Sequence, residues 1–120
     1  MERGALDPLV LAHKIVDVAA DRQASDIVLL DLRQLSPLTD YFVIASGSSE
    51  RQLEALDRNI VDEVFEALRV RPRQREGTAV SGWVLLDYGD VVVHLFGLAE
   101  REYYRLEELW AQAPTLVRVQ

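Results

Sequence analysis

The sequence predicts an α/β fold, a two-layer sandwich in which helices pack on a mixed β-sheet. Two observations predict it. Along the chain the hydrophobic patterns follow the order helix, strand, strand, helix, strand, strand, helix. The chain has 120 residues, and a chain of this length hides about two-thirds of its unfolded surface in one core. We therefore predict a single domain over residues 1–120, with its core over about residues 5–113 and a short C-terminal tail.

The first helix is predicted to begin at Pro8. Asp7 is a favourable N-cap residue, and proline is tolerated at the first helical position because the N–H there has no helical partner. Apolar residues then recur at helical spacing through about Asp21. The continuous apolar runs over residues 26–32 and 41–45 predict the first two strands, with a polar loop between them.

The second helix is predicted to begin after Ser49. Ser49 and Gln52 have the spacing of a capping box, in which two side chains satisfy free backbone N–H groups at the start of a helix. The apolar stripe of this helix continues to Leu68. Residues 69–82 are rich in arginine and turn-forming residues, which indicates a linker. The last helix is predicted over residues 100–113, because a proline follows and cannot continue it.

The centre of the predicted sheet is a β-hairpin from Trp83 to Phe96. Its two-residue loop, Gly89 and Asp90, suits a type II′ turn, because glycine adopts the positive φ that the first loop position requires. With this turn, all the residues on one face of the hairpin are apolar, which indicates the core. The opposite face carries Trp83, Leu85, Asp87, Val92, His94 and Phe96. An aspartate and a histidine among aromatic residues are typical of a surface that meets a partner, so we predict a binding face there.

Charge and composition exclude several classes of function. Twenty acidic residues against thirteen basic ones give a net charge of -7, which repels free nucleic acid and attracts a basic protein surface. The chain has no cysteine, so it has no disulfide, no thiolate nucleophile and no cysteine-ligated zinc. A reducing compartment is compatible with this composition, and we expect a cytoplasmic protein. Neither a signal sequence nor a run of ~20 apolar residues is present, so we expect no membrane partner.

Three arrangements of residues could support catalysis or ligand binding. Residues 47–49, Gly-Ser-Ser between a strand and a helix, could bind an anion or could simply cap the helix. The same turn would suit a nucleotidyltransferase-like enzyme, but the following strands offer only Asp87, whereas two-metal phosphoryl transfer needs several carboxylates. A serine of the turn with His94 and Asp87 could form a triad, although that serine is already engaged in the cap. The chain has no acidic cluster at ligand spacing from a histidine, so we expect no metal and no cofactor.

Two further features each have a functional and a structural interpretation. The alternating arginines from Arg69 to Arg75 would form a basic patch for a partner that carries RNA, or else a solvated loop. Trp83 would gain up to about 5 kcal/mol by burying its ~200 Å². Either a partner or the last helix would have to cover this side chain. Tyr103 and Trp110 on the last helix would themselves be core residues or form a contact between copies of the chain.

Three segments, in the same order, resemble the ribosomal silencing factor S family, also called Iojap-like. They are residues 39–52 (TDYFVIASGSSERQ), 82–96 (GWVLLDYGDVVVHLF) and 101–110 (REYYRLEELW). The resemblance covers about residues 5–111, and three collinear segments are far more specific than one short motif. It implies a non-catalytic, homodimeric α/β protein related in fold to nucleotidyltransferases. Such proteins bind large-subunit ribosomal protein fourteen on the joining face of the large ribosomal subunit, block docking of the small subunit and so repress translation.

The resemblance also implies which residues contact the partner. They are Trp83, Leu85, Asp87, Tyr88 and Asp90, with Tyr103 and Leu106 on the last helix beside them. Trp83 would be the anchor, and Asp87 and Asp90 would be the charge partners. Tyr88 would be a rim contact, although the predicted register places it on the opposite face from Trp83. Two alternative functions remain open: a nucleotidyltransferase-like, nucleotide-binding enzyme, and an RNA-binding protein that uses the arginine-rich segment.

Overall fold

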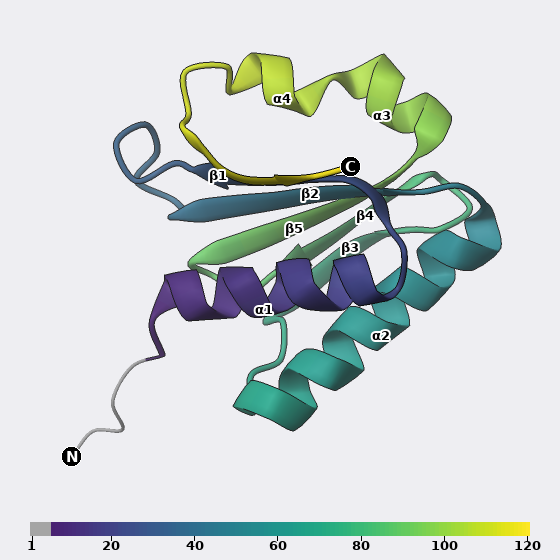
Figure 1. The fold of residues 1–120 in the computed structure, drawn as a ribbon, viewed down its shortest axis with the longest axis horizontal. Coiled ribbons are helices and arrows are strands. Elements are labelled where there is room, and N and C mark those ends of the chain that lie inside the picture. Colours follow the sequence, from purple (N-terminus) through teal and green to yellow (C-terminus); the bar gives the residue numbers. More distant parts are fainter. Residues whose placement is uncertain (1–5) are drawn as a thin grey trace.

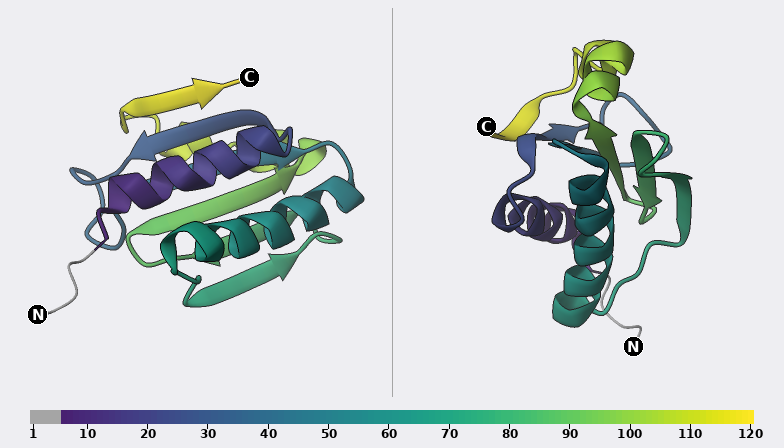
Figure 2. Two further views of the ribbon diagram at one scale, coloured as in Figure 1. Left: turned by 60° about the horizontal axis from the view of Figure 1, so that its bottom comes forward. Right: turned by 90° about the vertical axis from the view of Figure 1, so that its right-hand side faces the viewer.

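The computed structural model describes residues 6–120, which fold around one six-stranded sheet (Figure 1). Helices α1 (Pro8–Asp21) and α2 (Glu50–Leu68) cover one face of the sheet, and the short helices α3 (Leu98–Tyr104) and α4 (Leu106–Leu109) lie over the other (Figure 2). The strands are β1 (Ser25–Asp31), β2 (Tyr41–Gly47), β3 (Gln74–Thr78), β4 (Trp83–Asp87), β5 (Val91–Gly97) and β6 (Thr115–Val119). The predicted start of the core, at about residue 5, lies outside the described residues. Within them, no helix has the length and the apolar composition of a membrane span.

The strand order in the sheet is β3-β4-β5-β2-β1-β6. β2 and β5 pair in parallel, and every other neighbouring pair is antiparallel. The sheet is therefore mixed, and the predicted α/β class is confirmed. Helices α1 and α2 form the second layer of the predicted sandwich, while α3 and α4 add partial cover on the other face (Figure 2).

Both long helices begin at the predicted caps. The Asp7 side chain accepts the Leu9 N–H at 2.9 Å, and the Ser49 hydroxyl accepts the Gln52 N–H at 3.0 Å. The return bond of the predicted capping box is different, because the Gln52 side chain accepts the N–H of Ser48 at 2.6 Å. The Ser49 hydroxyl thus satisfies one of the free N–H groups in the first turn of α2, that of Gln52.

The hairpin of β4 and β5 has the predicted register. Trp83 lies opposite Phe96, and Leu86 lies opposite Val93. Gly89 has a φ of +92°, as the predicted turn requires. The residues are therefore divided between the two faces as predicted, but His94 and Phe96 of the predicted binding face are buried.

Strand β3 replaces part of the predicted linker. All five of its residues are exposed, and no apolar alternation marks it. It pairs antiparallel with β4, which places Glu76 opposite Leu85. An edge strand has only one neighbour and can be held by backbone hydrogen bonds alone, so a charged segment can form it.

Strand β6 replaces the predicted C-terminal tail. It pairs antiparallel with β1, which places Val117 opposite Leu29. The carbonyl oxygen of Pro114 accepts the N–H of Asp31 at 2.9 Å and so aligns the segment before the strand begins. With β3 and β6 included, the predicted order of four strands becomes one of six, and the sheet extends beyond residue 113.

The predicted last helix is in fact two short helices. The first, α3, already begins at Leu98, and the chain then turns at Arg105, which has a left-handed φ of +46°. The Arg105 N–H caps α3 by donating to the Arg101 carbonyl at 3.1 Å. The turn directs Leu106 into the molecule, where its side chain is only 8% exposed.

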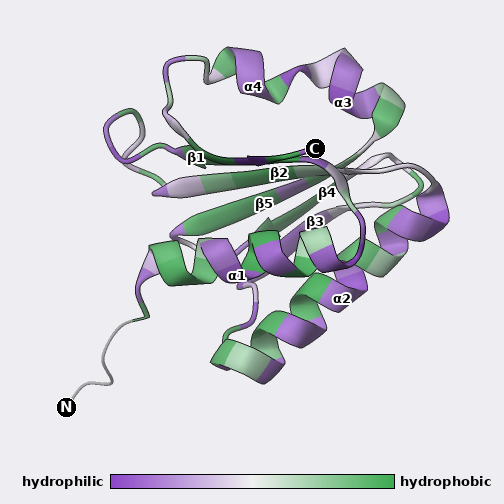
Figure 3. Cartoon of the chain, in the orientation of Figure 1, coloured by the Kyte–Doolittle hydropathy of each residue, from purple (hydrophilic) through white to green (hydrophobic). Residues whose placement is uncertain are grey.

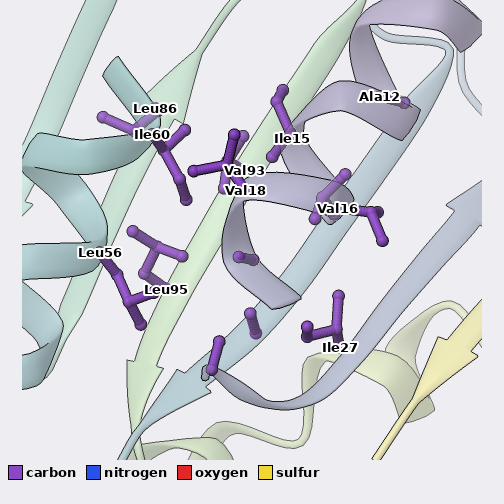
Figure 4. Close-up of a cluster of buried hydrophobic side chains, with 14 of the residues drawn as sticks. Ala12, Ile15, Val16, Val18, Ile27, Leu56, Ile60, Leu86, Val93 and Leu95 are labelled. Carbon is purple, nitrogen blue, oxygen red and sulfur yellow. The ribbon is translucent and has the colours of Figure 1, made fainter. Parts of the chain in front are cut away.

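The main core lies between the sheet and helices α1 and α2. Both helices carry alternating hydrophobic and hydrophilic segments along their length (Figure 3), as expected when one face packs on a sheet. Leu56 and Ile60 of α2 belong to the same buried cluster as Leu86 and Leu95 of the hairpin strands (Figure 4). All four side chains are 0% exposed, and complete burial of such a side chain contributes about 1.5–3 kcal/mol.

A smaller core lies on the opposite face of the sheet. Its buried members are Val28, Leu30, Leu32, Ile44, Phe96, Leu106 and Ala113, and Phe42, Trp83 and Trp110 pack at its margin. It lies under α4 and the segment that follows, near β1 and β2. Further along the same face, Trp83 and Leu85 of β4 remain only half-buried. The uneven cover of this face determines where a surface site can form.

We expect the replacement Arg75→Gln to destabilise the fold. Arg75 of β3 forms an ion pair with Asp57 of α2, and Asp57 is only 6% exposed. The variant would leave a buried carboxylate without its cation, so the free energy of unfolding should fall by about 2 kcal/mol in urea titration. The matched control is Arg71→Gln, because Arg71 is exposed and lies 3.8 Å over the Phe65 ring. Equal effects of the two variants would contradict the assignment of a structural role to the ion pair.

Candidate partner-binding site

A pocket of about 330 Å³ lies on the face of β4 that α1 and α2 do not cover. It is lined by Glu76, Gly77, Ser81, Trp83, Leu85 and Tyr104. The structure brings Trp83 and Leu85 together as predicted, because alternate residues of a strand point to the same face. An indole, a leucine and a phenol beside one carboxylate form the kind of hollow that receives a protruding side chain of a partner.

The indole of Trp83 is half-buried. Its ring centroid lies 4.6 Å from that of Tyr104 and 4.9 Å from that of Phe96. The sequence left open whether the last helix covers Trp83. Tyr104 at the end of α3 covers part of it, and the remainder lines the pocket because the chain turns away at Arg105.

A buried histidine accepts a hydrogen bond from the indole of Trp83. The Trp83 N–H donates to Nδ1 of His94 at 3.2 Å, and His94 is 5% exposed. Burial lowers the pKa of His94 to about 4, so its imidazole is neutral near pH 7. Asp87 lies diagonal to His94 in the register, but its Oδ1 instead accepts the Gly89 N–H at 2.7 Å.

Arg101 fixes α3, and with it Tyr104, on the sheet. Its side chain is 8% exposed. One guanidinium nitrogen donates to the Ser46 hydroxyl at 2.7 Å, and Nε donates to the Glu107 carboxylate at 2.8 Å. A carboxylate oxygen of Asp26 lies 3.7 Å from the same guanidinium. Charge-assisted bonds of this kind define a helix position more narrowly than apolar contact does.

The two predicted charge partners differ in their surroundings. Asp87 is partly engaged within the chain, because Arg73 Nε lies 3.5 Å from its Oδ1 and its side chain is 20% exposed. Asp90 is exposed at the tip of the hairpin. Its carbonyl oxygen accepts the N–H groups of Asp40 and Tyr41 at 2.9 and 3.1 Å, which fixes the tip while the side chain faces solvent. Asp90 is therefore the freer carboxylate.

The other three predicted contact residues are dispersed. Tyr88 packs against the main core, on the opposite side of the sheet from Trp83, and burial raises the pKa of its hydroxyl. Tyr103 is 80% exposed and contacts Tyr104, so it borders the pocket without lining it. Leu106 is buried in the smaller core and contributes to packing rather than to the surface. The predicted rim and helix contacts are thus not part of the pocket.

Four lining residues were not predicted from the sequence: Glu76, Gly77, Ser81 and Tyr104. Glu76 reaches the pocket only because β3 pairs with β4, and no apolar alternation marks β3. Tyr104 adjoins Tyr103 in the predicted helix, and the way α3 lies on the sheet brings Tyr104 against Trp83. The adjacent pair of tyrosines was the only available signal.

The turn at residues 47–49 acts as a helix cap. The hydroxyl of Ser49 is engaged in the cap of α2, so the possible triad with His94 and Asp87 is not assembled. Beside this turn, the Glu100 carboxylate fills the space over Gly97, where a Cβ atom would lie 2.4 Å from its Oε1. A phosphate bound here would meet this negative charge, which disfavours the nucleotidyltransferase-like alternative. Among residues 6–120 there is no group of three or more histidines and acidic residues that could hold a metal ion.

The arginine-rich segment is engaged within the chain. Arg75 pairs with Asp57, Arg73 lies near Asp87, and Arg71 lies over the Phe65 ring. These contacts favour the structural interpretation of the segment over an RNA-binding patch.

The fold and the site define a small α/β domain with an aromatic pocket suited to a protein partner. The family model described as "Ribosomal silencing factor during starvation", RsfS, matches residues 6–120. The chain belongs to this family, and the predicted resemblance is confirmed. It is 45% identical over 94 residues to ribosomal silencing factor RsfS of Bacillus subtilis, covering 78% of this chain and 79% of that protein. It is 32% identical over 113 residues to the chloroplastic protein Iojap of Arabidopsis thaliana, covering 89% of this chain and 44% of that protein.

Solved structures have the same fold. A crystal structure of a protein from Chromobacterium violaceum superimposes with a TM-score of 0.83 at 34% identity, covering 88% of each chain. A second crystal structure, from Bacillus halodurans, gives a TM-score of 0.77 at 36% identity, covering 91% of this chain and 98% of that one. The fold of this chain is therefore similar to folds determined by experiment over about nine-tenths of its length.

The stability of the protein should depend on pH through His94. The unfolded chain has a histidine pKa near the usual 6.5, whereas the folded value is about 4. As the pH falls from 6.5 to 4, the unfolded state binds a proton that the native state does not, so about 3 kcal/mol of stability is lost. Urea titrations of the wild type and of His94→Asn between pH 7 and pH 4 measure this loss. The difference between the two proteins should change across that range, and a constant difference would contradict the buried neutral imidazole.

Proposed function

We propose that this chain binds the large ribosomal subunit through large-subunit ribosomal protein fourteen and blocks joining of the small subunit, which represses translation. The observation that carries the proposal is the half-buried Trp83 in a pocket that the Glu76 carboxylate also lines. The names of the relatives support the ribosomal target, because several are ribosomal silencing factors. Trp83 would be the anchor that the partner covers.

The surroundings of Trp83 suit an anchor. Aromatic side chains dominate the energetics of many protein interfaces, and an anchor already held in one orientation loses little entropy on binding. Tyr104 and Phe96 contact the indole on one side, and His94 accepts its N–H. The part of the indole that lines the pocket is thus available to a partner in a defined geometry.

The charge of the chain supports a basic partner. The net charge is -7, Glu76 lines the pocket, and Asp90 is exposed at the hairpin tip. Opposite charge on the partner would accelerate association and align the two surfaces. The effect should be strongest at low ionic strength, where exposed charges are least screened.

Steric exclusion requires only a bound body of sufficient size. The described chain measures 45 × 32 × 24 Å along its principal axes. A rigid body of this size on the joining face would hold two ribosomal subunits apart without any chemical turnover. The proposal therefore assigns no catalytic residue and no cofactor.

We further propose that the protein acts in the cytoplasm as a homodimer. The cysteine-free composition is compatible with a reducing compartment. The edge strands β3 and β6 each have one unpaired side, where a second copy of the chain could add. Light scattering of the purified protein should give a mass near twice 13.6 kDa, and a monomer mass across the working concentration range would contradict the dimer.

Replacement of Trp83 by alanine should abolish ribosome binding while leaving the fold intact. Truncation of a central aromatic anchor commonly costs ~2 kcal/mol or more, which weakens binding about 30-fold or more. Co-sedimentation with large subunits and pull-down of purified protein fourteen measure the loss, and circular dichroism monitors folding. The control is Leu38→Ala, because Leu38 is 83% exposed and lies outside the pocket. Unchanged binding by folded Trp83→Ala would remove this site.

A further inference from the structure

The proposed function leaves open how Trp83 is kept in one orientation at a half-open surface. Resting on that function, we propose that His94 is a positioning residue: its Nδ1 accepts the indole N–H of Trp83 and so sets which part of the indole the partner meets. His94 does not line the pocket and would not touch the partner. Its effect on binding would pass entirely through Trp83.

The hairpin register makes this hydrogen bond possible. Leu85 lies directly opposite His94, and Trp83 is its diagonal neighbour on the same face. Diagonal neighbours across two strands are within reach of long and aromatic side chains, and the two nitrogens lie 3.2 Å apart. The imidazole itself is enclosed, because the Phe42 ring meets it edge-on at 4.5 Å and the Phe96 ring stacks at 6.3 Å. The acceptor is therefore held in a fixed place.

The bond also defines the protonation of the imidazole. An indole N–H can only donate, so Nδ1 must be unprotonated and the neutral ring carries its hydrogen on Nε2. Among residues 6–120, Nε2 of His94 finds no hydrogen-bond partner and is buried. A buried donor without a partner destabilises a fold, and an apolar residue of similar size would avoid that cost. Packing alone therefore does not account for a histidine here, whereas the need for an acceptor does.

Without this acceptor the indole would lose the interaction that distinguishes one orientation from another. Phe96 and Tyr104 offer ring contacts from one side, and such contacts tolerate rotation of the indole. A hydrogen bond is directional and favours one edge of the ring. Loss of one neutral hydrogen bond corresponds to about a fivefold change in an equilibrium constant. We therefore expect a measurable but partial effect on binding.

Two variants with the same number and branching of side-chain heavy atoms separate the acceptor from the packing. His94→Asn retains an oxygen close to the position of Nδ1, whereas His94→Leu replaces it by a methyl group. We measure the indole N–H resonance and its hydrogen exchange by NMR in the free protein, with Trp83→Phe to distinguish this signal from that of Trp110. We also measure affinity for purified large-subunit ribosomal protein fourteen. His94→Leu should lose exchange protection of the indole and bind about fivefold more weakly. His94→Asn should keep the exchange protection and the affinity of the wild type.

The outcomes distinguish this inference from the proposed function. If Trp83→Ala loses binding while His94→Leu binds as tightly as the wild type, the positioning role is overturned and the proposed function stands. If Trp83→Ala itself binds normally, the proposed site fails, and the inference fails with it. If the variants do not fold, the wild-type protein decides the question, because indole exchange as fast as that of free tryptophan would overturn the positioning role. Slow exchange at Trp83 would support it.

Discussion

The alternation of side chains along β4 and β5 constrains the rest of the molecule. Successive residues of a strand point to opposite faces, so a shift of one residue in the hairpin would exchange the core face and the pocket face. The loop at Gly89 opposes that shift, because its φ of +92° is a conformation that residues with a side chain rarely adopt. Leu86 can therefore be fully buried while its neighbour Leu85 is only half-buried. The site exists because this register is kept.

Unequal helix cover turns one of these faces into a surface site. Helices α1 and α2 have 14 and 19 residues and cover the main core, whereas α3 has only seven and ends at Tyr104. The chain then returns over β1 and β2 through Leu106, so β4 has no complete cover on that side. The indole of Trp83 therefore contacts aromatic side chains on one side and solvent on the other. A longer α3 would have made the same residue an ordinary part of the core.

Hydrophobic pattern and turn chemistry predicted those elements that are held by burial. The long helices, the central strands and the hairpin register all follow from apolar periodicity, caps and Gly89. Strands β3 and β6 were missed because an edge strand is held chiefly by backbone pairing, which leaves little side-chain signal. The same distinction explains which residues of the site were predicted. Trp83 and Leu85 follow from the hairpin. Glu76 depends on the pairing of β3, Tyr104 depends on how α3 lies on the sheet, and the burial of Leu106 depends on the turn at Arg105.

Buried polar groups on this face position two of the side chains that line the pocket, Trp83 and Tyr104. Arg101 ties α3 to Ser46 of β2, which places Tyr104 against the indole, and His94 holds the indole N–H from beneath. Each of these groups would be more stable in water than in a core unless it were hydrogen-bonded, so their burial contributes little to net stability. Their hydrogen bonds do restrict the conformational freedom of Tyr104 and of the Trp83 indole before a partner binds. Because the ordering of interface side chains opposes association by roughly 0.5–1.5 kcal/mol each, a pocket ordered in advance retains more of its contact energy as affinity.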